Sequence, residues 1–98
     1  MIPATLEAFW ESLKESGPPE GWPIPLKALW YDAQGNWEAS HNLAQDLETP
    51  MGSWIHGHLH RREGDSWNAG YWYRQAGKPY PEHSLEEELD RLILANLG

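Results

Sequence analysis

The sequence predicts an all-α protein, a compact bundle of about six short helices. Apolar residues recur at spacings of three and four, which is typical of helices with one buried face. No segment alternates apolar and polar residues with the period of two that a half-buried strand requires. Glycine or proline separates the periodic segments. The length of 98 residues fits a single all-helical domain spanning 1–98.

The first predicted helix covers residues 5–15. Its apolar positions recur on one face: Leu6, Phe9, Trp10 and Leu13. Gly17-Pro18-Pro19 ends it. The proline- and glycine-rich stretch up to Pro25 predicts an ordered loop, with Trp22 held against the core. A second helix is expected over residues 26–33, ending at Gly35.

Polar residues that cap helices mark the next starts. Asn36 is expected to cap a helix over residues 37–47. Thr49 and Pro50 suit the N-cap and first position of a fourth helix, which ends at Gly64.

The last two helices follow from the same signals. Asp65 caps a helix over residues 66–76, and Gly77 stops it. Pro79 and Pro81 keep the following segment extended. Ser84 and Glu87 form a capping box for a helix over residues 85–97. One face of that helix collects its apolar side chains and one amide: Leu85, Leu89, Leu92, Ile93 and Asn96.

The chain contains a short internal repeat with a period near thirty residues. Matching positions are Leu29 with Leu59, Trp37 with Trp67, Ala39 with Ala69, Gln45 with Gln75, and Gly35-Asn36 with Gly64-Asp65. In each copy a helix meets a Gly-polar turn, in which glycine allows positive φ and the next residue caps the following helix. This predicts two tandem αα-hairpins, over about 25–48 and 50–77, before a C-terminal helix over about 84–97.

The second hairpin resembles a tetratricopeptide-type hairpin, including its Sel1-like relatives. The positions that carry the resemblance are Gly57, Gly64, Asp65, Ala69, Tyr73, Ala76 and Pro81. The resemblance implies close helix packing at the alanines. The first copy departs from it, with His41 where the second has Tyr71.

Residues 56–77 also resemble a family of small uncharacterised proteins that carry the pattern H-x-x-L-H-R-x-E-G-D-x-x-N-A-x-Y-W-Y-x-x-A-G. Upstream, Trp37, His41 and Gln45 fit the same pattern. This resemblance implies kinship and no mechanism.

Composition excludes several classes of function. The chain has no cysteine, which excludes disulfide scaffolds, cysteine-ligated zinc fingers and thiol catalysis. Its net charge of −8 disfavours nucleic acid as a partner. No apolar run reaches the ~20 residues that span a membrane, and the start of the chain shows no signal peptide. We therefore expect a soluble cytoplasmic protein that binds neither nucleic acid nor membrane.

A local basic and aromatic surface over residues 56–78 predicts a binding module. Four of the seven basic residues lie there, although the chain is acidic. We expect this surface to hold a small anionic ligand or a protein partner, and the simplest protein partner is a second copy of the chain in a homodimer. The candidate binding residues are His56, His60, Arg61, Asp65, Trp67, Asn68, Tyr71 and Arg74. The alternative interpretation is that the charged residues of this surface are solvated and form local ion pairs without binding a partner.

Histidines at helical spacing lead to a second hypothesis, a small enzyme. His56, His60 and Glu63 share one stripe, and two imidazoles at i and i+4 can chelate one ion. If the helices pack antiparallel, His41 reaches this stripe. The four residues would bind Zn²⁺, Ni²⁺ or Fe²⁺. Without metal, His60 and Glu63 would form an acid–base pair. Half-buried structural histidines remain the alternative to both.

Overall fold

The computed structural model describes residues 2–97 and shows six α-helices and one short 3₁₀-helix, with no strand among these residues. The elements are α1 (Leu6–Glu11), η1 (Ser12–Lys14), α2 (Ile24–Ala33), α3 (Trp37–Ala44), α4 (Pro50–Arg62), α5 (Ser66–Ala76) and α6 (Leu85–Ala95). The all-α prediction is confirmed.

The four predicted N-caps are confirmed. The side chains of Asn36, Thr49, Asp65 and Ser84 each accept a hydrogen bond from the backbone N–H three residues on. Each bond satisfies one N–H that would otherwise be unpaired at the helix start. The second member of the predicted capping box is Glu87, and its side chain forms an ion pair with Arg91 at 2.6 Å.

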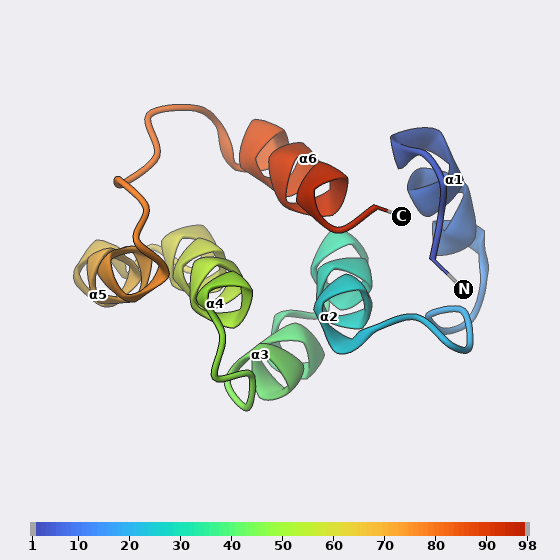
Figure 1. Ribbon diagram of the computed structural model, residues 1–98, viewed down its shortest axis with the longest axis horizontal. Helices are drawn as coiled ribbons and strands as arrows, with labels where there is room; N and C mark the ends of the chain where they lie inside the picture. The colour runs from blue at the N-terminus through green and yellow to red at the C-terminus, as the bar shows by residue number, and fades with distance from the viewer. Residues whose placement is uncertain (1, 98) are drawn as a thin grey trace.

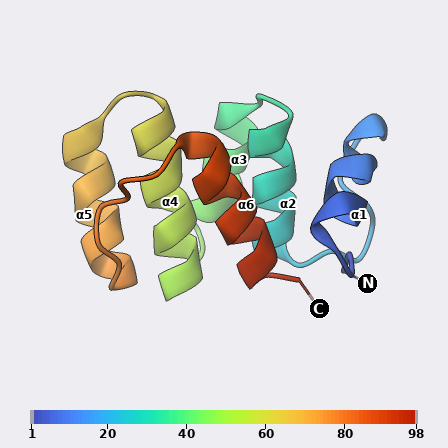
Figure 2. The ribbon, with the colours of Figure 1, turned by 90° about the horizontal axis from the view of Figure 1, so that it is seen from above.

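The two Gly-polar turns have nearly identical backbones. Gly35 and Gly64 have φ values of +85° and +87°. Asn36 and Asp65, which follow them, have φ/ψ values of −98°/79° and −97°/78°. The first turn packs α2 against α3 and the second packs α4 against α5, so the helices of each pair lie side by side (Figure 2).

Several helix ends differ from the predicted ones. After Glu11 the first helix tightens into η1, where the Ser12 hydroxyl donates to the Phe9 carbonyl at 2.5 Å. The third helix ends at Ala44 rather than at residue 47, because the N–H of Leu47 bonds to the Ala44 carbonyl and turns the chain toward Thr49. The second helix begins two residues earlier than predicted, with Pro25 in its first turn, where proline is tolerated. The sixth ends at Ala95.

Helices α2 and α4 lie at the centre of the molecule. Helix α3 packs on one side of this pair and α6 on the other, while α5 packs against α4 and α1 against α6 (Figure 1). The fully buried apolar side chains come mainly from the central helices and α6: Leu26, Leu29, Ile55, Leu59, Leu92 and Ile93, with Phe9 from α1. Trp22 is buried in the loop before α2, as predicted, and it stacks on Phe9 with the ring centroids 5.7 Å apart.

Candidate metal centre

Two histidines of α4 lie one turn apart on the face that meets α3. His56 and His60 are buried, with 6% and 8% of their surface exposed. Their rings stack with centroids 4.8 Å apart. The i, i+4 spacing therefore places two imidazoles on one buried patch of the helix.

His41 reaches this patch from α3. Its Nε2 atom lies 2.9 Å from Nε2 of His56, close enough for one ring to donate its N–H to the other. The three histidines each offer a ring nitrogen, and these nitrogens lie within 4.8 Å of one another. The expectation that packing of the third helix on the fourth brings His41 to the α4 histidines is confirmed.

The three nitrogens suit one metal ion. Zn–N bonds of about 2.0–2.1 Å in a tetrahedral site put two ligand nitrogens about 3.4 Å apart. In the His cluster (His41, His56 and His60), the separation of 2.9 Å between His41 and His56 is shorter than that value, and all three ring nitrogens lie within 4.8 Å of one another. The three ring nitrogens are therefore close enough to share one ion.

Two tryptophans hold the rings in place. Trp37 stacks on His41 with centroids 4.7 Å apart, and Trp72 of α5 stacks on His56 at 4.0 Å. The Trp37 indole N–H donates to the Leu59 carbonyl at 2.7 Å, which fixes its position. The sequence pattern grouped Trp37 with His41 but did not assign Trp72 to this site. Spacing within one helix gives no signal for a contact between α5 and α4.

Glu63 orients His60. Its Oε2 atom lies 2.7 Å from Nδ1 of His60, which leaves Nε2 of that ring for the cluster. A carboxylate that accepts from the second nitrogen of a ligand histidine is a common partner in metal sites. His60, Glu63 and Asp65 also form a second group whose ligand atoms lie within 4.8 Å of one another. Glu63 thus lies beside both His60 and Asp65.

Burial and neighbouring imidazoles favour the neutral forms of His41 and His56. Burial, followed by the charges that His41 and His60 would carry, lowers the pKa of His56 from 6.5 to about 4. Burial and His60 also lower the pKa of His41, although Glu63 opposes this. Neutral imidazole is the form that binds metal, so these two rings are ready to bind near pH 7.

Asp65 and Asn68 hold the start of α5. Asp65 accepts from the backbone and the side-chain amide of Asn68, at 3.1 and 3.2 Å. These hydrogen bonds, the backbone one first, lower the pKa of Asp65. Both side chains are thereby committed to the helix start.

Arg61 belongs to a buried ionic network on another face of α4. Its guanidinium donates to Glu88 of α6 at 3.1 Å and to the His83 carbonyl. Glu88 also accepts from His58, Tyr73 and Trp54, at 2.8, 2.7 and 3.1 Å.

The other end of the network lies on α2. Nε2 of the fully buried His58 is 3.0 Å from Asp32, which also accepts two hydrogen bonds from Arg62. Two carboxylates face one imidazole, and they outweigh the effect of burial and raise the pKa of His58. Sequence reasoning missed this network, because Asp32 and Glu88 lie 26 and 30 residues from His58.

The remaining predicted binding residues lie on the outer face of α5. Trp67 is 80% exposed, Tyr71 is 42% exposed, and Arg74 is exposed. Tyr71 packs edge-on against Trp72, which connects this face to the His cluster.

Searches of protein-family models, curated proteins and solved structures found no match to this chain. No helix in the described residues 2–97 combines the length and the apolar character needed to cross a membrane.

Proposed function

We propose that this protein binds one divalent transition-metal ion, zinc in the first instance, through His41, His56 and His60. The observation that carries the proposal is the convergence of three ring nitrogens within 4.8 Å. Lowered pKa values at His41 and His56 support it, since neutral imidazoles bind metal. Imidazole ligands suit zinc, nickel and iron alike.

Three imidazoles leave one coordination position of a tetrahedral ion for water or a small anion. This is the arrangement of catalytic zinc sites, in which the ion supplies Lewis acidity and makes bound water more acidic. We assign Glu63 as a positioning residue, because its carboxylate already holds Nδ1 of His60. A hydrolytic activity would depend on the water bound at this open coordination position.

The direct test is zinc binding to untagged, chelator-treated protein by isothermal titration calorimetry. We expect one equivalent to bind to the wild type, and at least about a hundredfold weaker binding after His56→Ala or His60→Ala. His83→Ala is the matched control, because His83 lies on the linker after α5, outside the His cluster.

The proposal fails if the wild type binds no zinc below about 100 μM, which is a weak interaction for three imidazoles. It also fails if His83→Ala weakens binding as much as His60→Ala does. Circular dichroism of each variant separates a lost ligand from a lost fold.

A second candidate function is association through the outer face of α5. The exposure of Trp67 and Tyr71 beside Arg74 supports it, because this composition is typical of interface hot spots. We propose a second copy of the chain as the partner. Sedimentation velocity should show a dimer that Trp67→Ala dissociates and Trp10→Ala, on α1, leaves intact. A monomeric wild type at about 100 μM would exclude this interface.

A further inference from the structure

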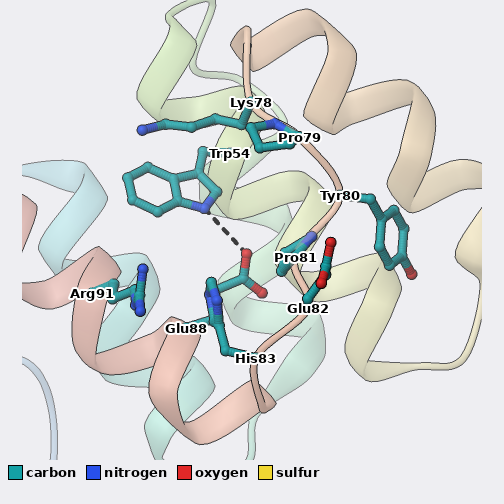
Figure 3. Close-up of a pocket in the computed structure, with 9 residues that line it drawn as sticks. All are labelled: Trp54, Lys78, Pro79, Tyr80, Pro81, Glu82, His83, Glu88 and Arg91. Atoms are coloured by element: carbon teal, nitrogen blue, oxygen red, sulfur yellow. Dashed lines mark hydrogen bonds between the residues drawn. The ribbon is translucent and has the colours of Figure 1, made fainter.

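A pocket of about 370 Å³ lies between α4, α6 and the linker that joins α5 to α6 (Figure 3). Trp54 comes from α4, Glu88 and Arg91 come from α6, and residues 78–83 of the linker complete the wall. None of these residues belongs to the His cluster. The pocket is therefore a separate candidate site, within the size range of small-molecule sites.

The indole of Trp54 is a fixed wall of this pocket. Its N–H donates to the Glu88 carboxylate at 3.1 Å. Glu88 is fully buried and is held in turn by His58, Arg61 and Tyr73. The ring therefore has a defined orientation before any ligand enters.

The linker wall is also held in place. The backbone N–H of Lys78 bonds to the Tyr73 carbonyl at 2.9 Å, and Arg61 bonds to the His83 carbonyl. Between these anchors, Pro79 and Pro81 restrict the backbone. A preformed pocket loses little entropy when it binds a ligand.

Two cations flank the indole. The Lys78 ammonium lies 4.2 Å from the ring centroid of Trp54. Arg91 lies near the other edge of the ring (Figure 3) and pairs with Glu87 at 2.6 Å, with both side chains more than half exposed. Such a surface ion pair contributes little, so Arg91 can exchange it for a ligand anion.

The acids of the pocket do not cancel these cations. The Glu88 carboxylate is paired with Arg61 at 3.1 Å and is hydrogen-bonded to His58 and Tyr73 at 2.8 Å each. Glu82 is exposed and lies across the pocket from Arg91 (Figure 3). An anion beside Arg91 is separated from Glu82, whereas a cation on the indole would have to displace Lys78.

We propose that this pocket binds a small flat carboxylate, with its anionic group at Arg91 and its apolar body against Trp54. The site is independent of metal binding at the His cluster. Benzoate is the simplest probe of this chemistry. Benzamide and benzylamine have nearly the same shape without the negative charge.

The experiment follows the side-chain N–H resonance of Trp54 by NMR, assigned by its loss in Trp54→Phe. We expect benzoate to shift it with a dissociation constant of about 1 mM, as befits so small a ligand. Arg91→Gln should weaken binding about tenfold, because it removes the cation at the anionic group. Lys14→Gln on η1 removes an exposed cation outside the pocket and should leave binding unchanged.

Three results would overturn the proposal. One is the absence of a shift with benzoate up to about 20 mM, well above the affinity expected for a fragment. Another is benzylamine or benzamide binding as tightly as benzoate. The third is equal affinity in wild type and Arg91→Gln. His41→Ala should bind benzoate like the wild type, so a failure of the metal proposal leaves this test intact.

Discussion

Two histidines that lie two positions apart on α4, His56 and His58, have pKa values shifted in opposite directions. His56 faces the imidazoles of His41 and His60. Burial, followed by these two imidazoles, lowers the pKa of His56 to about 4. His58 faces the carboxylates of Asp32 and Glu88, which raise its pKa against the effect of burial. The difference follows from the neighbouring helix in each direction: α3 presents histidine, whereas α2 and α6 present acids. One face of α4 therefore favours the neutral form of its histidine, whereas the other favours the protonated form.

The low pKa of His56 predicts an acid-sensitive fold in the absence of metal. In the unfolded chain His56 has its ordinary pKa of 6.5, so below this pH the unfolded state binds one more proton than the folded state. The free energy of unfolding should fall as the pH drops from 6.5 toward 4, by at most about 1.4 kcal/mol per pH unit from this group. Urea denaturation of chelator-treated protein measures it.

His56→Gln removes the titrating group and provides the comparison. We expect its stability to change less steeply with pH between 6.5 and 4 than that of the wild type. The remaining slope belongs to other groups, His41 among them, whose pKa is also lowered. Equal slopes in the two proteins would mean that His56 is not held neutral by the fold.

Glu63 should tune metal affinity without binding the metal. Glu63→Gln removes the charge that fixes Nδ1 of His60 and leaves all three ligand nitrogens in place. Loss of such a partner typically lowers metal affinity about 10–100-fold, which calorimetry detects. Glu86→Gln, on the exposed side of α6, is the control and should leave the affinity unchanged. Complete loss of binding in Glu63→Gln would instead assign Glu63 as a direct ligand.

Sequence spacing predicted part of the cluster at this scale. The i, i+4 rule placed His56 and His60 together, and helix packing brought in His41. The stacking of Trp72 on His56 was not predicted, because it depends on how α5 rotates against α4. The partners of His58 were not predicted either, since they come from α2 and α6.

At the scale of elements, a glycine sets the approach of α3 to α4. A Cβ atom at Gly52 would lie 2.5 Å from both Cβ and the carbonyl oxygen of Leu47, the residue that turns the chain after α3. Only glycine fits there without moving the backbone. The same turn brings His41 of α3 toward His56 of α4, so the site depends on this contact.

Gly52→Ala should therefore destabilise the protein by about 1–3 kcal/mol, as overpacked positions do. Gly70→Ala on α5 is the matched control. A Cβ atom at Gly70 would have Arg74 Nη1 as its nearest contact, at 3.5 Å. Alanine should therefore raise the free energy of unfolding by about 0.5–1 kcal/mol through its helix propensity. Urea denaturation of both variants measures whether the free energy of unfolding falls in Gly52→Ala and rises in Gly70→Ala. Equal effects would show that α3 and α4 have room to move apart.

The buried ionic network joins α2, α4, α5 and α6 through Asp32, His58, Tyr73 and Glu88. Burial works against the charge of Glu88, but His58 and its other donors outweigh it and lower its pKa. Glu88→Gln removes this charge and leaves Arg61 and His58 facing a neutral amide. We expect a loss of about 3–5 kcal/mol in the free energy of unfolding, as for other broken buried pairs.

The control is Arg91→Gln, which breaks an exposed pair on the same helix. It should change stability by less than about 0.5 kcal/mol. A comparably small effect of Glu88→Gln would show that water reaches the network. Chemical denaturation at pH 7 distinguishes these outcomes.

Helix starts were predicted better than helix ends. Side-chain caps such as Asn36 and Asp65 act within three residues, so the local sequence contains the whole signal. The end of α3 at Ala44 depends on the turn through Leu47 and its packing on Gly52, a tertiary contact. The same limit explains why the arrangement of α6 across α2 and α4 could not be predicted from periodicity.

At the scale of the whole molecule, a net charge of −8 favours the binding of cations. A divalent ion at the His cluster would link α3 to α4 and thereby stabilise the fold in proportion to its affinity. The pocket beside Trp54 lies between α4, α6 and the linker after α5, and it offers Lys78 and Arg91 as cations. Two sites of opposite preference thus fit on one small bundle.

The central claim is that His41, His56 and His60 bind one metal ion together, and zinc X-ray absorption spectroscopy tests it most directly. For protein loaded with one equivalent of zinc we predict three imidazole nitrogens at about 2.0–2.1 Å and one further light ligand. His41→Ala should reduce the imidazole count by one. A spectrum dominated by oxygen ligands, or one with a single imidazole that His41→Ala leaves unchanged, would contradict the account.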